Sequence, residues 1–154
     1  MIQIEDPVLI VGDIHGQFYD LLKIIDIGGD PATNKYIFMG DYIDRGYFSL
    51  EVLLILISFK INFPKNIVLL RGNHECRQLA ETFNFYEEIM HKYDKDIFEA
   101  FIQCFQCLPL ACILNKKFLI IHGGISPELN SIQQIRNLNR FCEPPKNGLF
   151  WFTY

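Results

Sequence analysis

The amino-acid sequence predicts an α/β protein in which helices flank a mostly parallel sheet. Short apolar runs alternate with longer segments in which apolar residues recur at helical spacing. The chain is 50% hydrophobic, which is typical of buried parallel strands and also of a fragment that leaves part of its core uncovered. No repeat, low-complexity stretch or linker divides the chain, so we expect residues 1–154 to form a single domain.

The first half of the chain is expected to form a βαβαβ unit. The predicted strands are 8–11, 36–39 and 66–70, and the predicted helices are 18–27 and 50–63. Gly28 and Gly29 should end the first helix, and Pro64 should end the second. We expect the strand at 8–11 to be buried. The strand–helix–strand–helix–strand order predicts right-handed crossovers and a parallel sheet.

The second half is expected to continue with helices and then a hairpin. The helical patterns cover 83–92 and 94–107, and a shorter one covers 133–138. Two apolar runs at 111–114 and 118–121 are separated by a turn at Asn115 and Lys116. Such a short connection predicts an antiparallel pair of strands.

Charge and hydropathy exclude several classes of function. The net charge is −4 with a pI of about 5.5, and the basic residues are scattered, so we expect no nucleic-acid partner. The apolar run 50–59 is shorter than the ~20 residues that span a bilayer, so we expect no membrane insertion. Glu5 and Asp6 stand where a signal peptide would carry positive charge. We therefore expect a cytoplasmic, or also nuclear, protein.

The five cysteines do not predict a disulfide framework. Their number is odd and no secretion signal precedes them. Cys104 and Cys107 form a CxxC pair inside a helical pattern, without the glycine or proline turns of a redox or zinc motif. We interpret both as buried helical cysteines.

Polar clusters follow four of the predicted strands. They cover residues 12–16, 40–46, 71–75 and 122–124, and they contain three of the four histidines of the chain. In open α/β sheets, ligands bind at the carboxyl ends of the strands. We therefore expect these clusters to converge on one site.

The clusters contain the ligand types of a centre with two metal ions. These ligands are Asp13, His15, Asp41, Asn73 and His122. Asp13 and His15 are two residues apart, so both side chains can point the same way, and Asp41 can bridge two cations. Mixed nitrogen and oxygen ligands suit zinc, iron or manganese.

Each of these residues also has an ordinary structural explanation. An aspartate after a strand is often a turn or helix-cap residue, and an asparagine such as Asn73 is often part of a turn. We interpret His91 as a surface residue and Glu75 as a residue that holds its turn. The joint pattern of the clusters favours a functional role over an ordinary structural one at six positions, which are Asp13, His15, Asp41, Asn73, His74 and His122.

The clusters resemble the signature blocks of the phosphoprotein phosphatases, within the metallophosphoesterase superfamily. The matching segments are 12–16, 40–46, 71–75 and 122–127, in the same order and at similar spacings. Segments 46–49 and 135–145 resemble the calcineurin (protein phosphatase 2B) catalytic subunit more than other branches. The resemblance extends over about residues 4–148 and implies a calcineurin-like metallophosphoesterase fold whose second sheet is incomplete here.

The resemblance implies a role for each clustered residue. Asp13, His15 and Asp41 would hold the first ion, and Asp41, Asn73 and His122 the second, with iron and zinc or manganese as the metals. A hydroxide activated by both ions would attack the phosphorus atom. His74 would protonate the leaving oxygen while Asp44 orients its ring, and Arg45 and Asn73 would bind the phosphate.

The resemblance also implies a substrate and partners. The activity would be hydrolysis of phosphoserine and phosphothreonine in phosphoproteins. The family suggests a calcium-binding regulatory subunit and calmodulin, but the segments that bind them are absent from this sequence. A further histidine ligand and a second phosphate-binding arginine of the family would also come later, so we expect a truncated, weakly active or inactive form.

Two alternative functions remain open from the sequence. A phosphodiesterase or bis-nucleotide hydrolase could use the same metal ligands, although segments 44–46 and 122–127 favour the phosphoprotein branch. A non-catalytic fragment is the other alternative.

Overall fold

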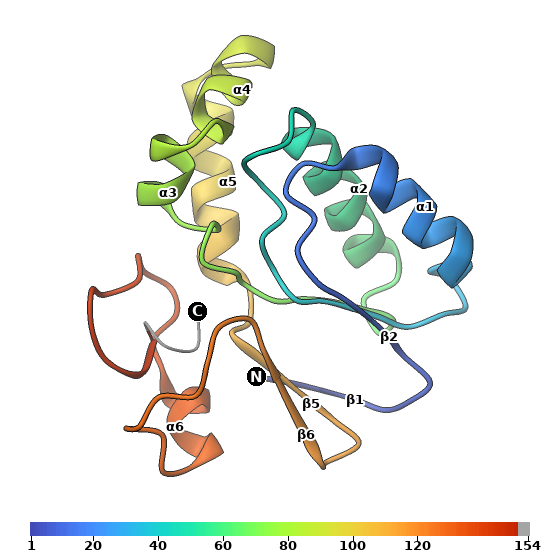
Figure 1. Cartoon of the computed structure of the whole chain (residues 1–154), viewed down its shortest axis with the longest axis vertical. Coiled ribbons are helices and arrows are strands. Elements are labelled where there is room, and N and C mark those ends of the chain that lie inside the picture. Colours follow the sequence, from blue (N-terminus) through green and yellow to red (C-terminus); the bar gives the residue numbers. More distant parts are fainter. Residues whose placement is uncertain (151–154) are drawn as a thin grey trace.

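The computed structural model describes residues 1–150, which contain six strands and six helices (Figure 1). The strands are β1 (Ile2–Ile4), β2 (Leu9–Val11), β3 (Tyr36–Phe38), β4 (Ile67–Leu69), β5 (Ala111–Leu114) and β6 (Phe118–Ile121). The helices are α1 (Phe18–Gly28), α2 (Ser49–Asn62), α3 (Arg77–Thr82), α4 (Phe85–Lys92), α5 (Lys95–Cys107) and α6 (Ile132–Asn137). The α/β class predicted from the sequence is confirmed.

The strands form two three-stranded sheets. One has the order β2-β3-β4 and is parallel throughout, as the βαβαβ prediction requires. The other has the order β1-β5-β6, in which β1 is parallel to β5, and β5 and β6 form the predicted antiparallel hairpin. Strand β1 and helix α3 were not predicted.

The strands of the parallel sheet are not equally buried. Every residue of β3 and β4 is buried, because β3 lies at the centre and helices and the second sheet cover β3 and β4. Strand β2 lies at the edge, and its Ile10 is 49% exposed. The prediction that residues 8–11 form a buried strand is therefore wrong. Ile10 packs in neither core cluster, whereas Val68, at the same position of the other edge strand β4, packs in the smaller one.

Alternating residues of the parallel sheet face two different cores. Tyr36 and Phe38 of β3 join the large apolar cluster formed with α1, α2, α4 and α5. Ile37 between them joins a smaller cluster with Ile4 of β1 and Ile120 of β6. Helices therefore cover one face of the parallel sheet and the second sheet packs on the other.

Helix α5 begins at a favourable cap residue and carries two of the five cysteines. Asp94 accepts a hydrogen bond from the Ile97 amide and begins α5, as a preferred N-cap residue does. On α5, Cys104 is partly buried but Cys107 is exposed, so the expectation that both cysteines are buried fails for Cys107. None of the helices in residues 1–150 is long and apolar enough to cross a membrane.

Candidate metal centre

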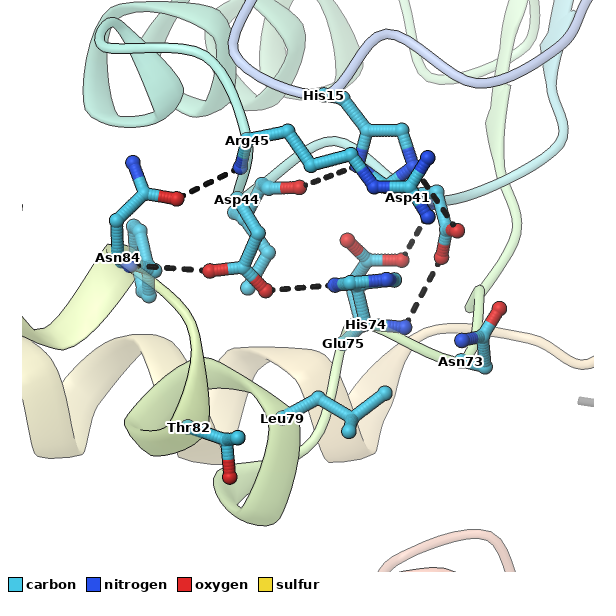
Figure 2. Close-up of polar contacts among 12 residues, drawn as sticks. His15, Asp41, Asp44, Arg45, Asn73, His74, Glu75, Leu79, Thr82 and Asn84 are labelled. Carbon is cyan, nitrogen blue, oxygen red and sulfur yellow. Dashed lines mark hydrogen bonds and ion pairs between the residues drawn. The ribbon is translucent and has the colours of Figure 1, made fainter.

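The predicted ligands lie in loops at the carboxyl ends of four strands. Asp13 and His15 follow β2, Asp41 follows β3, Asn73 follows β4, and His122 follows β6 of the second sheet. The structure brings these five side chains together, and Figure 2 shows three of them, His15, Asp41 and Asn73. His91 is exposed on α4, away from the cluster, as the sequence suggested.

Asp41 lies between two imidazoles. Its Oδ2 is 3.4 Å from the Nε2 of His15, and its Oδ1 is 3.4 Å from the Nε2 of His122. The Oδ2 of Asp13 is 3.8 Å from the same His15 nitrogen, and the Nε2 of His122 is 2.9 Å from the Oδ1 of Asn73. One carboxylate that faces a histidine on each oxygen is the geometry of a bridging ligand.

Backbone carbonyls fix the orientation of both imidazoles. The Nδ1 of His15 donates to the Ile43 carbonyl at 2.7 Å, and the Nδ1 of His122 donates to the Met39 carbonyl at 3.0 Å. A neutral ring that donates from Nδ1 presents an unprotonated Nε2, which is the form that binds metal. Both Nε2 atoms face Asp41.

The donor set fits a pair of metal ions. The buried Nε2 of His15 forms no hydrogen bond within residues 1–150, although carboxylate oxygens lie close to it. At His122, a lone pair on Nε2 would face the lone pairs of two oxygens, which is unfavourable without a cation between them. Imidazole nitrogens with carboxylate and amide oxygens suit zinc, iron or manganese. These residues therefore fit the ions that the sequence pattern indicates.

Glu75 holds the backbone around Asp41. Its buried carboxylate accepts hydrogen bonds from the amides of Asp41 at 2.7 Å, Tyr42 at 2.8 Å and Gly72 at 2.9 Å. Burial and the nearby Asp41 charge raise the pKa of Glu75 to about 8 in the metal-free chain. A Cβ at Gly72 would lie 2.4 Å from both the amide and a carboxylate oxygen of Asp41, so only glycine fits there. Glu75 thus has the structural role that the sequence suggested.

His74 and Asp44 form a buried pair beside the ligands (Figure 2). The Nδ1 of His74 is 2.7 Å from the Oδ2 of Asp44, whose other oxygen accepts from the Phe85 amide at 3.0 Å. The His74 amide donates to Asp41 at 2.9 Å. Burial lowers the pKa of His74, but the hydrogen bond to Asp44 and the charge of Asp41 outweigh it and raise the pKa above its usual value. The ring can therefore hold a proton next to the ligands.

Arg45 lies at the exposed rim of the site. Its side chain extends from the loop after β3 toward His15 and Asp41 (Figure 2). Within residues 1–150 its guanidinium takes part in no ion pair, so the group is available to an anion held between it and the ligands. A planar guanidinium binds phosphate oxygens in a bidentate manner.

Two further residues around the site were not predicted from the sequence. Arg71 is fully buried, and its Nε and Nη1 donate to the carbonyls of Glu75, Arg140 and Cys142. Asn84 forms hydrogen bonds with the backbone of the Arg45 loop. Arg71 stood inside a polar cluster, but only its burial identifies its role, and Asn84 belongs to no motif.

The fold and the site together define a metallophosphoesterase. The sequence matches the calcineurin-like phosphoesterase family over residues 6–153, and the chain belongs to that family. Among the relatives, it is 54% identical to the serine/threonine-protein phosphatase 2B catalytic subunit A2 of Saccharomyces cerevisiae over 97% of this chain. It is 48% identical to subunit A1 of the same yeast over the same share of the chain. The chain spans about a quarter of the length of each, 25% and 27%.

Solved structures give the same assignment of the fold. A protein serine/threonine phosphatase from Saccharomyces cerevisiae, with similarity to human phosphatase PP5, superposes with a TM-score of 0.96 at 36% identity. The match covers 99% of this chain and 51% of that one. A protein-tyrosine phosphatase of a Shewanella species gives a TM-score of 0.62 at 20% identity, over 81% of this chain and 44% of that one. That similarity establishes the fold alone.

Proposed function

We propose that this chain carries the metal and phosphate site of a protein serine/threonine phosphatase. The observation that carries the proposal is the Asp41 carboxylate between His15 and His122, with Arg45 at the rim. The family uses a dinuclear metal centre, and we propose iron with zinc, or manganese, as the metals. The names of the yeast relatives support phosphoserine and phosphothreonine in phosphoproteins as substrates.

The proposed ligand sets share one residue. Asp13, His15 and Asp41 would hold one ion, and Asp41, Asn73 and His122 the other. Bound ions of this kind lower the pKa of water and stabilise the charge that develops on phosphate oxygens. The domain of the proposed enzyme would include residues 1–154.

The other residues of the site act on the substrate. Arg45 would hold the phosphate by two oxygens, and the amide of Asn73 would contribute a further contact. His74 would donate its proton to the departing serine or threonine oxygen, since a positioned acid is worth about 10²–10⁴-fold in rate. Asp44 keeps the His74 ring in place and stabilises its charged form.

The second candidate is a phosphodiesterase or bis-nucleotide hydrolase. A structure of a proposed diadenosine tetraphosphatase resembles this chain with a TM-score of 0.62 at 18% identity, covering 86% of this chain and 58% of that one. The fold therefore suits both classes of substrate. Segments 44–46 and 122–127 and the named relatives favour the phosphoprotein as substrate.

A substrate panel tests the proposal. The chain, loaded with Mn²⁺, is incubated with a phosphoserine peptide and with diadenosine tetraphosphate, and phosphate or nucleotide release is followed. We expect release from the peptide alone, at the weak rate predicted from the sequence for this chain. His74→Asn should lower that rate by about 10²–10⁴-fold with Mn²⁺ binding unchanged. His91→Asn is the matched control because that imidazole is exposed on α4.

The other outcomes are equally informative. Cleavage of the dinucleotide alone would support the second candidate. Loss of Mn²⁺ in His74→Asn would identify this residue as a ligand rather than the acid. Absence of hydrolysis from both substrates would agree with a non-catalytic role for this chain.

A further inference from the structure

The start of helix α4 is fastened to the loop that carries Arg45. The side chain of Asn84 makes two hydrogen bonds with neighbouring backbone groups of this loop (Figure 2 shows the first). Its Oδ1 accepts from the Arg45 amide at 2.7 Å, and its Nδ2 donates to the Gly46 carbonyl at 2.7 Å. The Asn84 side chain thus bonds the backbone on both sides of the peptide bond between Arg45 and Gly46.

The usual reason for an asparagine at this position does not apply. Asn84 is the N-cap residue of α4, where an asparagine oxygen ordinarily accepts from an amide in the first turn of its helix. Its side chain makes no such bond. Both polar ends of the amide are directed to the Arg45 loop instead, so the side chain serves the loop rather than the helix.

The backbone that Asn84 holds is in an unusual conformation. Asp44 and Arg45 have φ values of 69° and 66°, in the left-handed region that side chains other than glycine rarely adopt. This conformation is unfavourable for residues with a Cβ, so contacts outside the loop must maintain it. The bonds from Asn84 supply such contacts at Arg45 and Gly46.

The remaining contacts of the loop leave little freedom on its other side. Gly46 packs on the loop after β2, where a Cβ would lie 2.4 Å from the His15 carbonyl oxygen. The carboxylate of Glu88, one turn after Asn84 on α4, accepts from the amides of Ser49 at 3.1 Å and Leu50 at 2.9 Å. The Arg45 segment is thus held between the His15 loop and α4, and Asn84 is the side chain that bonds the Arg45 amide.

We propose that Asn84 is a positioning residue that fixes the Arg45 backbone and so directs its guanidinium toward a bound phosphate. The inference rests on the proposed function, in which Arg45 binds the phosphate. Asn84 acts through Arg45 and does not touch the substrate. Removal of its side chain should free the loop to leave the left-handed conformation, and the guanidinium would then have to be ordered each time phosphate binds.

The first test needs neither metal nor activity. Amide hydrogen exchange is measured on the metal-free chain and on Asn84→Ala. The Arg45 amide should exchange about fivefold faster in the variant, since it loses a neutral hydrogen bond. Asn62→Ala is the matched control, because the Asn62 side chain also bonds one backbone group but does so at the far end of α2.

A conservative variant separates this effect from damage to α4. Asn84→Asp retains an oxygen for the Arg45 amide and loses only the donor to Gly46. The Arg45 amide should therefore stay close to the exchange rate of the unsubstituted chain. Unchanged exchange at Arg45 in Asn84→Ala, or equally fast exchange in both variants, would overturn the inference.

The second test measures phosphate binding. Inorganic phosphate is titrated into the Mn²⁺-loaded chain by calorimetry, for the unsubstituted chain, Asn84→Ala, Arg45→Ala and the double variant. Asn84→Ala should weaken binding by about 3–10-fold, the range of one or two neutral hydrogen bonds. In the Arg45→Ala background the same substitution should change nothing, because Asn84 acts through Arg45.

The two tests distinguish this inference from the proposed function. An equal loss of affinity with and without Arg45 would show a general structural role and overturn the inference. Absence of phosphate binding by the unsubstituted, Mn²⁺-loaded chain would count against the proposed function. Amide exchange at Arg45 would then decide alone whether Asn84 holds this backbone.

Discussion

Four residues of the site adopt a backbone conformation that side chains usually avoid. His15, Asp41, Asp44 and Arg45 have φ values of 45°, 53°, 69° and 66°. Such residues persist only where their surroundings hold them, and they are concentrated at functional sites. Here these residues are held by hydrogen bonds with Glu75, with Asn84 and with the loop after β2. The left-handed turns let consecutive short segments direct their side chains at one point.

Glu75 offers a prediction at the scale of one residue. In Glu75→Gln, an amide nitrogen that cannot accept replaces one carboxylate oxygen, so either the Tyr42 amide or the amides of Asp41 and Gly72 lose their acceptor. We expect a loss of about 1–3 kcal/mol in the free energy of unfolding, the cost of an unsatisfied buried donor. Urea denaturation of the metal-free chain measures it.

A second glutamate provides the control for this substitution. Glu81 is 46% exposed and pairs with Arg77 at 3.1 Å, so Glu81→Gln should cost less than about 1 kcal/mol. Equal losses for the two variants would contradict the role of Glu75 in holding the loop.

At the scale of elements, short strands end in long polar loops. Strands β2, β3 and β4 have three residues each, and the ligand-bearing loops begin directly after them. Helix α2 packs against α1, α4 and β4. The loop that carries Arg45 runs directly into this helix, which begins at Ser49. The rigidity of the loop therefore depends on how firmly α2 is packed.

Two leucines test how firmly α2 is packed. Leu56 is fully buried in the large core, whereas Leu54 on the same helix is 49% exposed. Leu56→Ala should lower the free energy of unfolding by about 2–5 kcal/mol, because it removes apolar contacts and leaves a cavity. Leu54→Ala should cost less than about 1 kcal/mol. Similar values from thermal or urea unfolding would show that α2 is not packed as described.

At the scale of the whole molecule, the proposed centre joins the two sheets. Asp41 and Asn73 follow strands of the parallel sheet, and His122 follows β6 of the other sheet. Without metal, the sheets meet through the apolar cluster around Ile37 and Ile120 and through contacts of His122. An ion held by ligands from both sheets would add a second connection.

Metal should therefore stabilise the hairpin of β5 and β6 as well as the loops. Addition of Mn²⁺ at 100 times its Kd should raise the free energy of unfolding by ~2.7 kcal/mol. Amide exchange in β5 and β6 should slow at the same time, and a chelator should reverse both effects. His122→Ala should remove the slowing in the hairpin, while His91→Ala should not. Binding of Mn²⁺ without any slower exchange in the hairpin would contradict the connection.

Short segments of the sequence contain the predicted metal ligands. Each predicted ligand stands within a few residues of an apolar strand. The ends of parallel strands meet at one edge of a sheet, so convergence of the clusters at 12–16, 40–46 and 71–75 follows from the sequence pattern. His122 follows β6 of the other sheet, so its place in the site depends on how the two sheets pack. The hairpin at Asn115 and Lys116 was also predictable, since its turn and both of its strands are contiguous. These features depend on short stretches of chain whose patterns are complete in themselves.

The tertiary structure decided what depends on distant parts of the chain. Strand β1 has three residues and forms only by pairing with β5. Helix α3 has Cys76 as its N-cap residue, and the Cys76 sulfur accepts from the Leu79 amide where an oxygen is usual. The hydrogen bond from the Arg45 amide to the Asn84 side chain joins residues 39 positions apart. No local pattern encodes such contacts, because they exist only once helices and sheets have packed. The sequence by itself determined the class of fold and which residue types could serve as ligands, and packing determined how those side chains are held.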